Sequence, residues 1–363
     1  MGRGVSIAHV AAKAGVGVGT VSRVLNGNTR VSASTRDRVL HVMEALDYRP
    51  SRLASGLSRG RTGSVAVLVP FVTRPSVVAR LAGVLSVLAA EGIDSLVCDI
   101  ETAEQRDRRL DGLLRRHSAD GVLVVSLPIP RRYVEGLRQM HIPLAAVDAD
   151  IPTVRRVVTD DVTGGRLAAE HLTALGHTRI GFVGDEPDSR LGFVSTSRRL
   201  SGYRQALQAA GVTPDPRLVR RVPHGAEPAA AAAVALLKLP VSPTAIFAAS
   251  DTQAMGVLRG AERVGLDVPG DLSVIGYDDV EAAEMLQLTT VHQPLKESGI
   301  RGAQIMCDLL GGTPTATSRQ ALPVEVVPRA STGYLKRARA PGPARTPAGR
   351  QPAPAGRHLP VPR

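Results

Sequence analysis

Four hydrogen-bonding side chains lie close together near the start of the chain, at Thr20, Ser22, Arg23 and Asn26. An arginine guanidinium can bind the O6 and N7 acceptors of guanine through two parallel hydrogen bonds. Hydroxyl and amide groups suit phosphate oxygens, and phosphate contacts orient a protein on the double helix without reading its sequence. These residue types therefore predict a DNA-binding surface, provided that one helix presents them together.

Three short helices are expected around these residues. Ile7–Ala14 has apolar residues at helical spacing, and Gly15 can take the left-handed conformation that ends such a helix. A further helix is expected at Ser34–Leu46. A helix, a tight turn that contains glycine and a second helix form the arrangement that lays the second helix in the DNA major groove. Residues 16–26 are therefore predicted to form a recognition helix.

Two glycine patterns in this region have other possible meanings. Residues 15–19, Gly-Val-Gly-Val-Gly, resemble a dinucleotide-binding loop, but that loop follows a strand and here a helix is expected. Residues 56–60 fit the G-x-S-x-G pattern of a hydrolase, but its serine needs an apolar strand before it and this segment is a basic linker. Since the sequence shows no P-loop or metal-ligand cluster either, we expect no enzyme activity and no cofactor.

Basic charge is confined to the two ends of the chain. The net charge is +12; residues 1–62 hold 10 basic and 3 acidic residues, and residues 336–363 hold 7 basic residues and no acidic ones. The intervening residues hold 28 basic and 30 acidic residues. A basic end is expected of a protein that binds a polyanion. The Pro-, Ala- and Arg-rich tail after Leu335 has no periodicity and is predicted to be disordered.

Cysteine usage and hydropathy predict a cytoplasmic protein. Cys98 and Cys307 lie far apart in apolar surroundings, so each is expected to be a buried free thiol in a reducing compartment. No apolar run is long enough to span a membrane, and the first residues lack the apolar segment of a signal peptide. We therefore expect neither a membrane segment nor export.

From Ser64 onward, apolar runs of strand length alternate with helical patterns. The expected strands are 65–69, 95–98, 122–125, 144–147, 180–183, 245–248 and 274–275. The expected helices are 77–90, 104–116, 164–175, 198–210, 228–237 and 252–264, with a short additional candidate at 51–58. Apolar strands that alternate with helices predict an α/β fold with doubly wound parallel sheets. So many units predict two sheets, with a ligand cleft between them.

Over roughly residues 5–335 the chain resembles the lactose-repressor (LacI) family of bacterial transcription regulators. The motifs that carry the resemblance are residues 7–16 and 20–26, Tyr48-Arg49-Pro50, residues 53–57, Leu175-Gly176-His177, residues 274–279 and residues 288–291. The resemblance implies an all-α helix-turn-helix headpiece, a hinge helix and a core of two subdomains like that of periplasmic sugar-binding proteins. It also implies a homodimer that binds a palindromic DNA operator.

The resemblance suggests four segments. The headpiece is expected at 1–50, the hinge helix and linker at 51–62, the effector-binding and dimerisation core at 63–335, and the tail at 336–363. Within the core, one subdomain is expected at 63–158 with 292–320, and the other at 159–291 with 321–335. Some relatives form tetramers through a C-terminal heptad helix, but residues 336–363 have no heptads and many prolines, so a dimer is expected.

The resemblance also suggests which residues contact DNA. It places base contacts at Arg23, Val18 and Gly19, although Val18 offers only an apolar contact and Gly19 almost none. Leu57 matches a residue that wedges into the minor groove at the centre of the operator and kinks the duplex. Thr20 as a helix cap, Arg23 as a solvated surface residue and Leu57 as hinge packing remain alternatives. Phosphate contacts are expected from basic residues that flank the hinge, at Arg49, Arg52, Arg59 and Arg61.

Two headpiece positions differ from the family pattern. Gly17 stands where Ser or Thr usually caps the recognition helix, so that side-chain cap is lost. His9 stands at a position that is usually acidic, and we expect it to weaken a capping box formed with Ser6. Neither change removes the motif.

For the effector cleft, the resemblance points to Arg199 and Asp278, with Asp148 as a third contact. Arginine and aspartate together suit a polyol, because carboxylates accept hydrogen bonds from hydroxyl groups and guanidinium donates them. Alternatively, Asp278 braces a crossing between subdomains and Asp148 caps the next segment. Asp251 is expected to cap a helix and to act indirectly.

Other cleft positions depart from the family. Residues 74–77, Arg-Pro-Ser-Val, replace a segment that supplies an aromatic side chain in many relatives. Ser250 replaces a common asparagine ligand, and His224 lies where some relatives place an aromatic residue. We therefore expect a small or charged sugar, with Arg74, Ser250 and His224 as further candidate contacts.

The sequence thus predicts a DNA-binding repressor that responds to a small molecule, most simply a sugar. One alternative is a regulator of the same fold that is controlled by a protein corepressor or by a metabolite other than a sugar. A periplasmic-type sugar-binding protein is disfavoured, because the headpiece is present and a signal peptide is absent. The basic tail could add nonspecific DNA affinity or be an inert extension.

Overall fold

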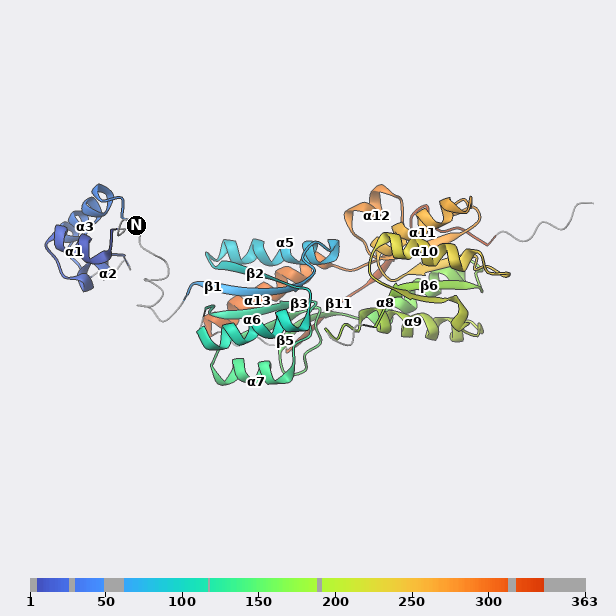
Figure 1. Ribbon diagram of the computed structural model, residues 1–363, viewed down its shortest axis with the longest axis horizontal. Coiled ribbons are helices and arrows are strands. Elements are labelled where there is room, and N and C mark those ends of the chain that lie inside the picture. Colours follow the sequence, from blue (N-terminus) through green and yellow to red (C-terminus); the bar gives the residue numbers. More distant parts are fainter. Residues whose placement is uncertain are drawn as a thin grey trace, which may run out of the picture.

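The structure is a computed structural model that describes residues 5–25, 30–48, 62–116, 118–187, 191–312 and 318–335. These residues form one small helical unit and two α/β units (Figure 1). The predicted helix at 51–58 and the predicted disordered tail at 336–363 lie outside the described residues.

The helical unit contains α1 (Ile7–Ala14), α2 (Val18–Leu25) and α3 (Ala33–Ala45). The three helices pack around Val10, Val21 and Val39, whose side chains are fully buried. Gly15 ends α1 in the left-handed conformation, with φ of 63°. The three predicted helices and the turn between the first two are therefore confirmed.

Local hydrogen bonds stabilise the first turns of α1 and α2. The Ser6 backbone N–H donates to Nδ1 of His9 at 3.1 Å, so the expectation that His9 weakens this capping box was wrong. An unprotonated imidazole nitrogen accepts the hydrogen bond that an acidic side chain would accept. At α2 the backbone oxygen of Gly17 accepts from the Thr20 N–H at 2.8 Å. Gly17 has no side chain to add a second bond, as the sequence predicts.

The first sheet has the strand order β11 (Arg319–Leu322), β5 (Arg155–Thr159), β4 (Leu144–Val147), β3 (Gly121–Val125), β1 (Ser64–Pro70), β2 (Asp94–Ile100), and every neighbouring pair is parallel. One face packs against α5 (Pro75–Ala90) and α13 (Leu295–Gly311), the other against α6 (Ala103–Arg116) and α7 (Arg131–Gln139) (Figure 1). Alternate residues of a strand enter opposite cores, as Val67 and Leu68 do.

The second sheet has the order β12 (Glu325–Val327), β10 (Thr289–His292), β9 (Ser273–Asp278), β8 (Ala245–Ala248), β6 (Ile180–Asp185), β7 (Val219–Val222). It is parallel except for β12, which is antiparallel to β10. One face packs against α8 (Asp161–Ala174) and α9 (Ser195–Ala209), the other against α10 (Ala226–Leu237) and α11 (Asp251–Arg263). A short helix, α12 (Glu281–Met285), and a 3-10 turn (Pro216–Leu218) complete this unit.

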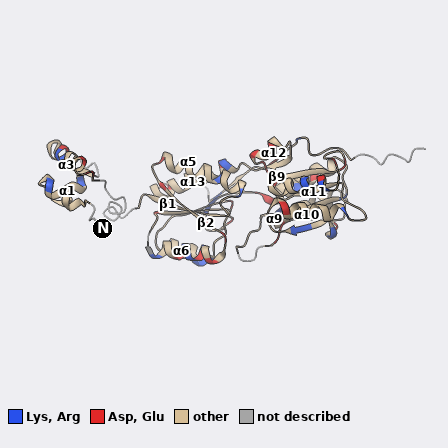
Figure 2. Cartoon of the chain, turned by 45° about the horizontal axis from the view of Figure 1, so that its top comes forward, with Lys and Arg blue, Asp and Glu red and all other residues tan. Residues whose placement is uncertain are grey.

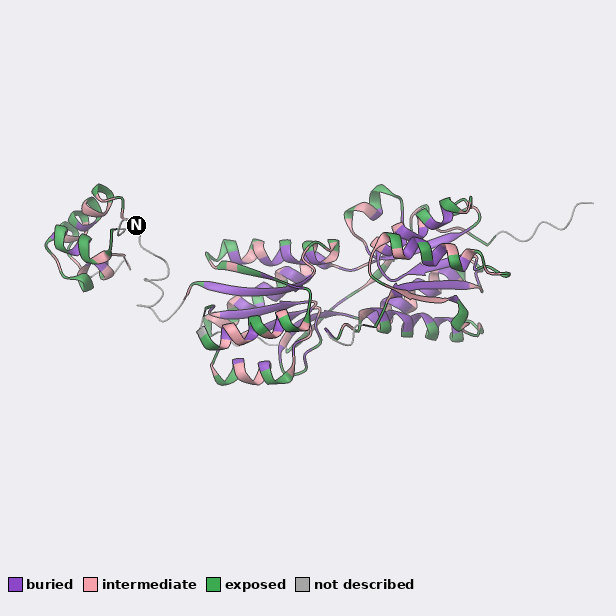
Figure 3. Cartoon of the chain, viewed as in Figure 1, coloured by how far each residue is buried: buried purple, intermediate pink, exposed green. Residues whose placement is uncertain are grey.

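The described chain crosses between the two sheets after β5, after β10 and after β11. Each sheet is therefore built from segments that are distant in sequence. In Figure 3 the central strands of both sheets are buried and the outer faces of the helices are exposed. In Figure 2, β1 carries no charged residue, whereas α6 carries both acidic and basic ones. The predicted residue boundaries of the two subdomains stay a prediction.

The seven predicted strands and six predicted core helices all overlap observed elements. The sequence reasoning missed the strands β5, β7, β10, β11 and β12 and the helices α7, α12 and α13. The omission of α13 has a clear physical cause, because glycines inside an apolar segment argue against a helix. Here they allow close packing: a Cβ at Gly299 would lie 2.0 Å from the backbone oxygen of Arg80 on α5.

Both cysteines are free thiols; Cys98 is buried as predicted, but Cys307 is only half-buried. Among the described residues, no helix is long and apolar enough to cross a membrane. The same residues contain no group of three or more His, Cys, Asp and Glu side chains that could hold a metal ion.

Candidate DNA-binding helix and effector cavity

Helix α2 turns one side to the helical core and the other to solvent. Val21 and Val24 are buried against α1 and α3. The predicted DNA contacts on α2 divide into exposed Val18, Gly19 and Arg23, and half-buried Thr20 and Ser22. The exposed side of α2 is therefore available to a groove of DNA. The other predicted contacts, Asn26, Arg52 and Leu57, lie outside the described residues.

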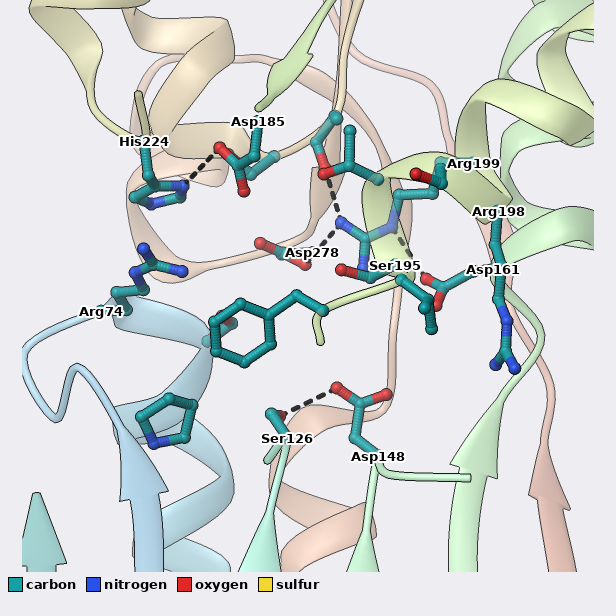
Figure 4. Close-up of a pocket in the computed structure, with 18 of the residues that line it drawn as sticks. Arg74, Ser126, Asp148, Asp161, Asp185, Ser195, Arg198, Arg199, His224 and Asp278 are labelled. Carbon is teal, nitrogen blue, oxygen red and sulfur yellow. Dashed lines mark hydrogen bonds and ion pairs between the residues drawn. The ribbon is translucent and has the colours of Figure 1, made fainter. Parts of the chain in front are cut away.

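A cavity of about 270 Å³ lies between the two sheets, at the carboxyl ends of their strands. In parallel sheets these ends lie at one edge, which is where α/β proteins bind ligands. The sequence reasoning named six effector contacts, and all of them line this cavity: Arg74, Asp148, Arg199, His224, Ser250 and Asp278. Figure 4 labels Arg74, Asp148, Arg199, His224 and Asp278 around the central space.

Arg199, on α9, is held on three sides. Its Nε donates to Oδ1 of Asp161 at 2.8 Å, and Nη1 donates to the backbone oxygen of Ala249 at 2.5 Å (Figure 4). The guanidinium carbon lies 3.7 Å from the ring centroid of Tyr277. Burial opposes the charged form, but Asp161, Tyr277 and Asp278 outweigh it and hold the pKa of Arg199 above its ordinary value. The cavity therefore contains a fixed, permanently charged donor.

Asp278 connects with the first unit through Gln293, a residue that the sequence reasoning missed. Gln293 is 1% exposed; its Nε2 donates to Oδ1 of Asp278 at 2.6 Å. Its Oε1 accepts from Arg80 at 3.1 Å and from Oγ1 of Thr159 at 2.9 Å. One amide thus connects α5, β5 and β9 at a crossing between the units. The signal that could have found it is a polar residue between an apolar strand and an apolar helix.

Asp148 faces the cavity from the end of β4, with φ of 54°. One of its oxygens accepts from Oγ of Ser126 at 2.9 Å and pairs with Arg80 at 2.9 Å. Its other oxygen accepts from Oγ1 of Thr159 at 3.3 Å. Burial raises the pKa of Asp278, and Arg199 and Arg80 act in the opposite direction. Arg80 therefore lies between the two carboxyl groups that the sequence reasoning placed in the cleft.

His224 and Ser250 lie on the second unit. Nδ1 of His224 lies 3.0 Å from Oδ1 of Asp185, which also accepts from Nε2 of Gln253 at 2.8 Å (Figure 4). Ser250 caps α11, where its Oγ accepts from the Gln253 N–H at 3.2 Å. The sequence reasoning gave the cap to Asp251, and that assignment was wrong.

Asp251 has a different role, since it is fully buried next to the cap. Its carboxylate accepts from Oγ1 of Thr290 at 2.6 Å and from the Val280 N–H at 2.9 Å. Burial and the neighbouring charge of Asp278 raise the pKa of Asp251 to about 7. It binds together β10 and the segment after β9, behind the cavity.

Two aromatic side chains line the cavity although residues 74–77 contain none. Phe71 follows β1 and Phe193 precedes α9, and their ring centroids lie 6.3 Å apart. The guanidinium carbon of Arg74 lies 4.0 Å from the ring centroid of Phe71. The sequence reasoning missed both aromatics because they lie outside the segment that supplies an aromatic residue in relatives.

Comparison with known proteins decides the family. Residues 6–51 match the model of bacterial regulatory proteins of the lacI family, and residues 169–332 match a periplasmic binding protein-like domain. The HTH-type transcriptional regulator DegA of Bacillus subtilis is 34% identical over 339 residues, covering 91% of this chain and 98% of DegA. The chain belongs to the lacI family. It is therefore a DNA-binding transcriptional regulator and not an enzyme.

Solved structures of lacI-family proteins support the same architecture. The lac repressor dimer bound to operator and the anti-inducer ONPF is 28% identical, with a TM-score of 0.80, and the match covers 91% of this chain and 100% of the repressor. The complex of the regulator CelR with cellobiose is 32% identical, with a TM-score of 0.67, and covers 90% of this chain and 99% of CelR. The helix-turn-helix headpiece and the periplasmic-binding-protein-like core are thus those of the lacI family.

Proposed function

We propose that this lacI-family regulator is a repressor that binds a palindromic operator as a homodimer and responds to a sugar. One observation carries the proposal: the same chain joins an exposed recognition helix to a cavity whose buried charged groups are already paired. Its proposed site of action is the cytoplasm, because its target is chromosomal DNA. A periplasmic-type binding protein would have no use for α2.

The paired charges favour a neutral polyol as the effector, in place of the charged sugar that the sequence analysis also allows. Arg199 pairs with Asp161, and Arg80 pairs with Asp148. Such pairs leave carboxylate oxygens that accept from hydroxyl groups and guanidinium nitrogens that donate to them. Phe71 and Phe193 offer apolar surface to a sugar ring. The cellobiose complex of CelR shows that a relative of this chain binds a sugar.

The proposed effector contacts are the six predicted residues that line the cavity, with Arg199 and Asp278 as the main ones. On DNA, Arg23 is proposed to bind guanine, with apolar or backbone contacts from its neighbours on α2. The complete proposed set on DNA is Val18, Gly19, Thr20, Ser22, Arg23, Asn26, Arg52 and Leu57. Arg23 and Leu57 carry most of the sequence preference in this proposal, because the leading end of α2 offers few side chains that can bind bases.

The proposed dimer surface includes the edge of the first sheet. Strand β2 ends that sheet and exposes Leu96 and Val97, and Val78 on the adjacent helix α5 is also exposed. An edge strand with exposed apolar side chains is normally covered in the working assembly. A second copy of this chain is the proposed cover, since the related lac repressor binds its operator as a dimer.

Selection of bound DNA from random sequence tests the operator half of the proposal. The expected result is a palindrome with a flexible pyrimidine–purine step at its centre, where the Leu57 pair would insert. An asymmetric consensus would contradict the dimeric model.

Calorimetry with a panel of sugars, followed by operator binding in their presence, tests the effector half. The expected result is one sugar that binds and changes operator affinity. If no sugar binds, a metabolite of another class or a protein corepressor controls the regulator. The effector proposal then fails while the DNA proposal stands.

A further inference from the structure

A second pocket lies on the first unit, beside α7 and the amino ends of β4 and β5. Its volume is about 670 Å³, and its apolar wall includes Ile142, Leu144 and Val154. Its polar rim includes Arg131, Arg138, His141 and Arg155. None of the proposed effector contacts lines it. It is thus a separate pocket, and the DNA-binding and effector proposals leave it without a role.

The charges of this pocket are unbalanced, in contrast with those of the effector cavity. Glu135 is the one acidic residue among the described residues that line it, and Glu135 is already paired with Nε of Arg131 at 2.7 Å. Arg138 and Arg155 form no ion pair with the described part of the chain. Two guanidinium groups therefore remain uncompensated around one concave surface.

Arg155 supplies an independent observation. Its Nη1 atom is buried and has no hydrogen-bond partner in the structure. A buried donor without a partner costs free energy, so native proteins rarely leave one unpaired. Nη1 is shielded from solvent, so an acceptor in the pocket would meet the guanidinium of Arg155 at its other nitrogens, which are not buried without a partner. The acceptor that suits an uncompensated guanidinium is an anionic oxygen.

The pocket lies at the end of the first sheet where the chain enters from the headpiece. The strands of this sheet are parallel, so the amino ends of β1, β3, β4 and β5 share one edge. The effector cavity lies at the opposite edge, at the carboxyl ends of the strands. At that edge Asp120 accepts from the backbone N–H groups of Thr62 and Gly63, at 2.6 and 2.7 Å. In β3, which follows Asp120, the backbone N–H of Val122 donates to the backbone oxygen of Pro143. Pro143 lines the pocket.

The geometry points to a second binding site of this regulator, which takes a phosphate group through Arg138 and Arg155. A phosphate offers several anionic oxygens to two guanidinium groups, and the apolar wall accommodates the part of the ligand that carries it. The phosphate belongs either to a phosphomonoester in solution or to the backbone of the operator flanks, since the site faces the headpiece end of the core.

Titration of the full-length protein with inorganic phosphate, by calorimetry in chloride buffer of constant ionic strength, tests the site. The variant R138Q/R155Q removes both charges, and R108Q/R109Q removes two charges from exposed positions of α6 as the matched control. Unfolding of each variant by urea verifies the fold. Phosphate affinity is expected to fall at least about tenfold in R138Q/R155Q and to stay unchanged in the control.

Operator binding at several salt concentrations distinguishes the two sources. If the backbone of DNA supplies the phosphate, the slope of log affinity against log salt becomes shallower by roughly one for each lost contact in R138Q/R155Q, but not in the control. If a phosphomonoester supplies it, the slopes agree and only phosphate binding is lost. The proposal is overturned if neither phosphate affinity nor the salt slope separates R138Q/R155Q from R108Q/R109Q.

Discussion

The effector cavity and the recognition helix expose their functional side chains in opposite ways. In the cavity, Arg199 is 7% exposed and is held by Asp161, Ala249 and Tyr277. On α2, Arg23 is exposed to solvent, and the burial on that helix comes from valines on its other side. In the cavity the same side chains therefore serve ligand binding and folding, whereas on α2 different side chains serve DNA binding and folding.

This difference has a physical origin. A buried charge is stable only while its partner is present, so a change at one cavity residue alters both the ligand site and the fold. An exposed side chain on a helix contributes little to folding, because water replaces its contacts. DNA preference can thus change by substitution on α2 at little cost in stability, while the cavity changes only with compensation.

The largest expected effect is that of Arg199→Ala. It leaves the carboxylate of Asp161 buried without its partner, which costs about 3–5 kcal/mol of unfolding free energy. Urea denaturation measures this loss, and calorimetry should show that effector binding disappears. The matched control is Arg198→Ala on the same helix, whose half-exposed ion pair with Asp150 contributes less than about 1 kcal/mol. Equal stability of the two variants would contradict the importance that we assign to burial.

Arg23→Ala should produce a large effect on DNA binding without one on folding. Operator affinity is expected to fall by roughly 1–3 kcal/mol, because a bidentate contact with guanine is lost. Unfolding free energy should change by no more than about 0.5 kcal/mol. Arg38→Ala, at an exposed position of α3, controls for charge. If both variants lost the same affinity, Arg23 would act only through its charge.

The pH dependence of unfolding tests the burial of Asp251. Its folded pKa of about 7 lies above the unfolded value near 3.9, so between these values the folded state binds a proton that the unfolded state has released. Asp251 therefore lowers stability progressively as the pH rises from about 4 through about 7.

Urea denaturation of wild type and Asp251→Asn across this pH range isolates that contribution. Burial lowers the pKa of His171 and of His177, which removes stability as the pH falls below about 6.5 and thus gives the opposite slope. Both histidines remain in the variant, so they cancel in the difference. The stability of wild type relative to the variant should fall from pH 5 to pH 8, and parallel curves would contradict the raised pKa.

The smallest expected effect is that of Gly17→Ser at the start of α2. A Cβ at Gly17 meets no atom within 4 Å, so serine fits and can supply the missing cap. The expected gain is a few tenths of a kcal/mol, visible as a slightly higher melting temperature of the headpiece. Gly17→Ala fills the same space without a hydroxyl group. A gain of equal size in alanine would attribute the effect to backbone entropy instead of capping.

Much of the fold follows from local patterns. Buried strands such as β1 and β3 are continuous apolar runs, and helices such as α6 have strong periodicity, so both are found from sequence. β11 and β12 are short strands whose residues are mostly exposed or half-buried, and no local signal marks them. Only pairing with β5 and β10 makes them strands.

The sequence by itself determined the helix-turn-helix, because its signals lie within a few residues: apolar spacing, Gly15 and a cluster of donors. It also named six residues that line the effector cavity, through motifs that resemble a family. Only the tertiary structure decided how those residues are joined. Phe71 and Phe193 reach the cavity from distant segments, and Gln293 holds Asp278 from a third. Arg138 and Arg155 line one pocket because α7 packs against β4, the neighbour of β5. Contacts between distant segments depend on the packing of whole sheets and helices, and no local pattern of residues contains that information.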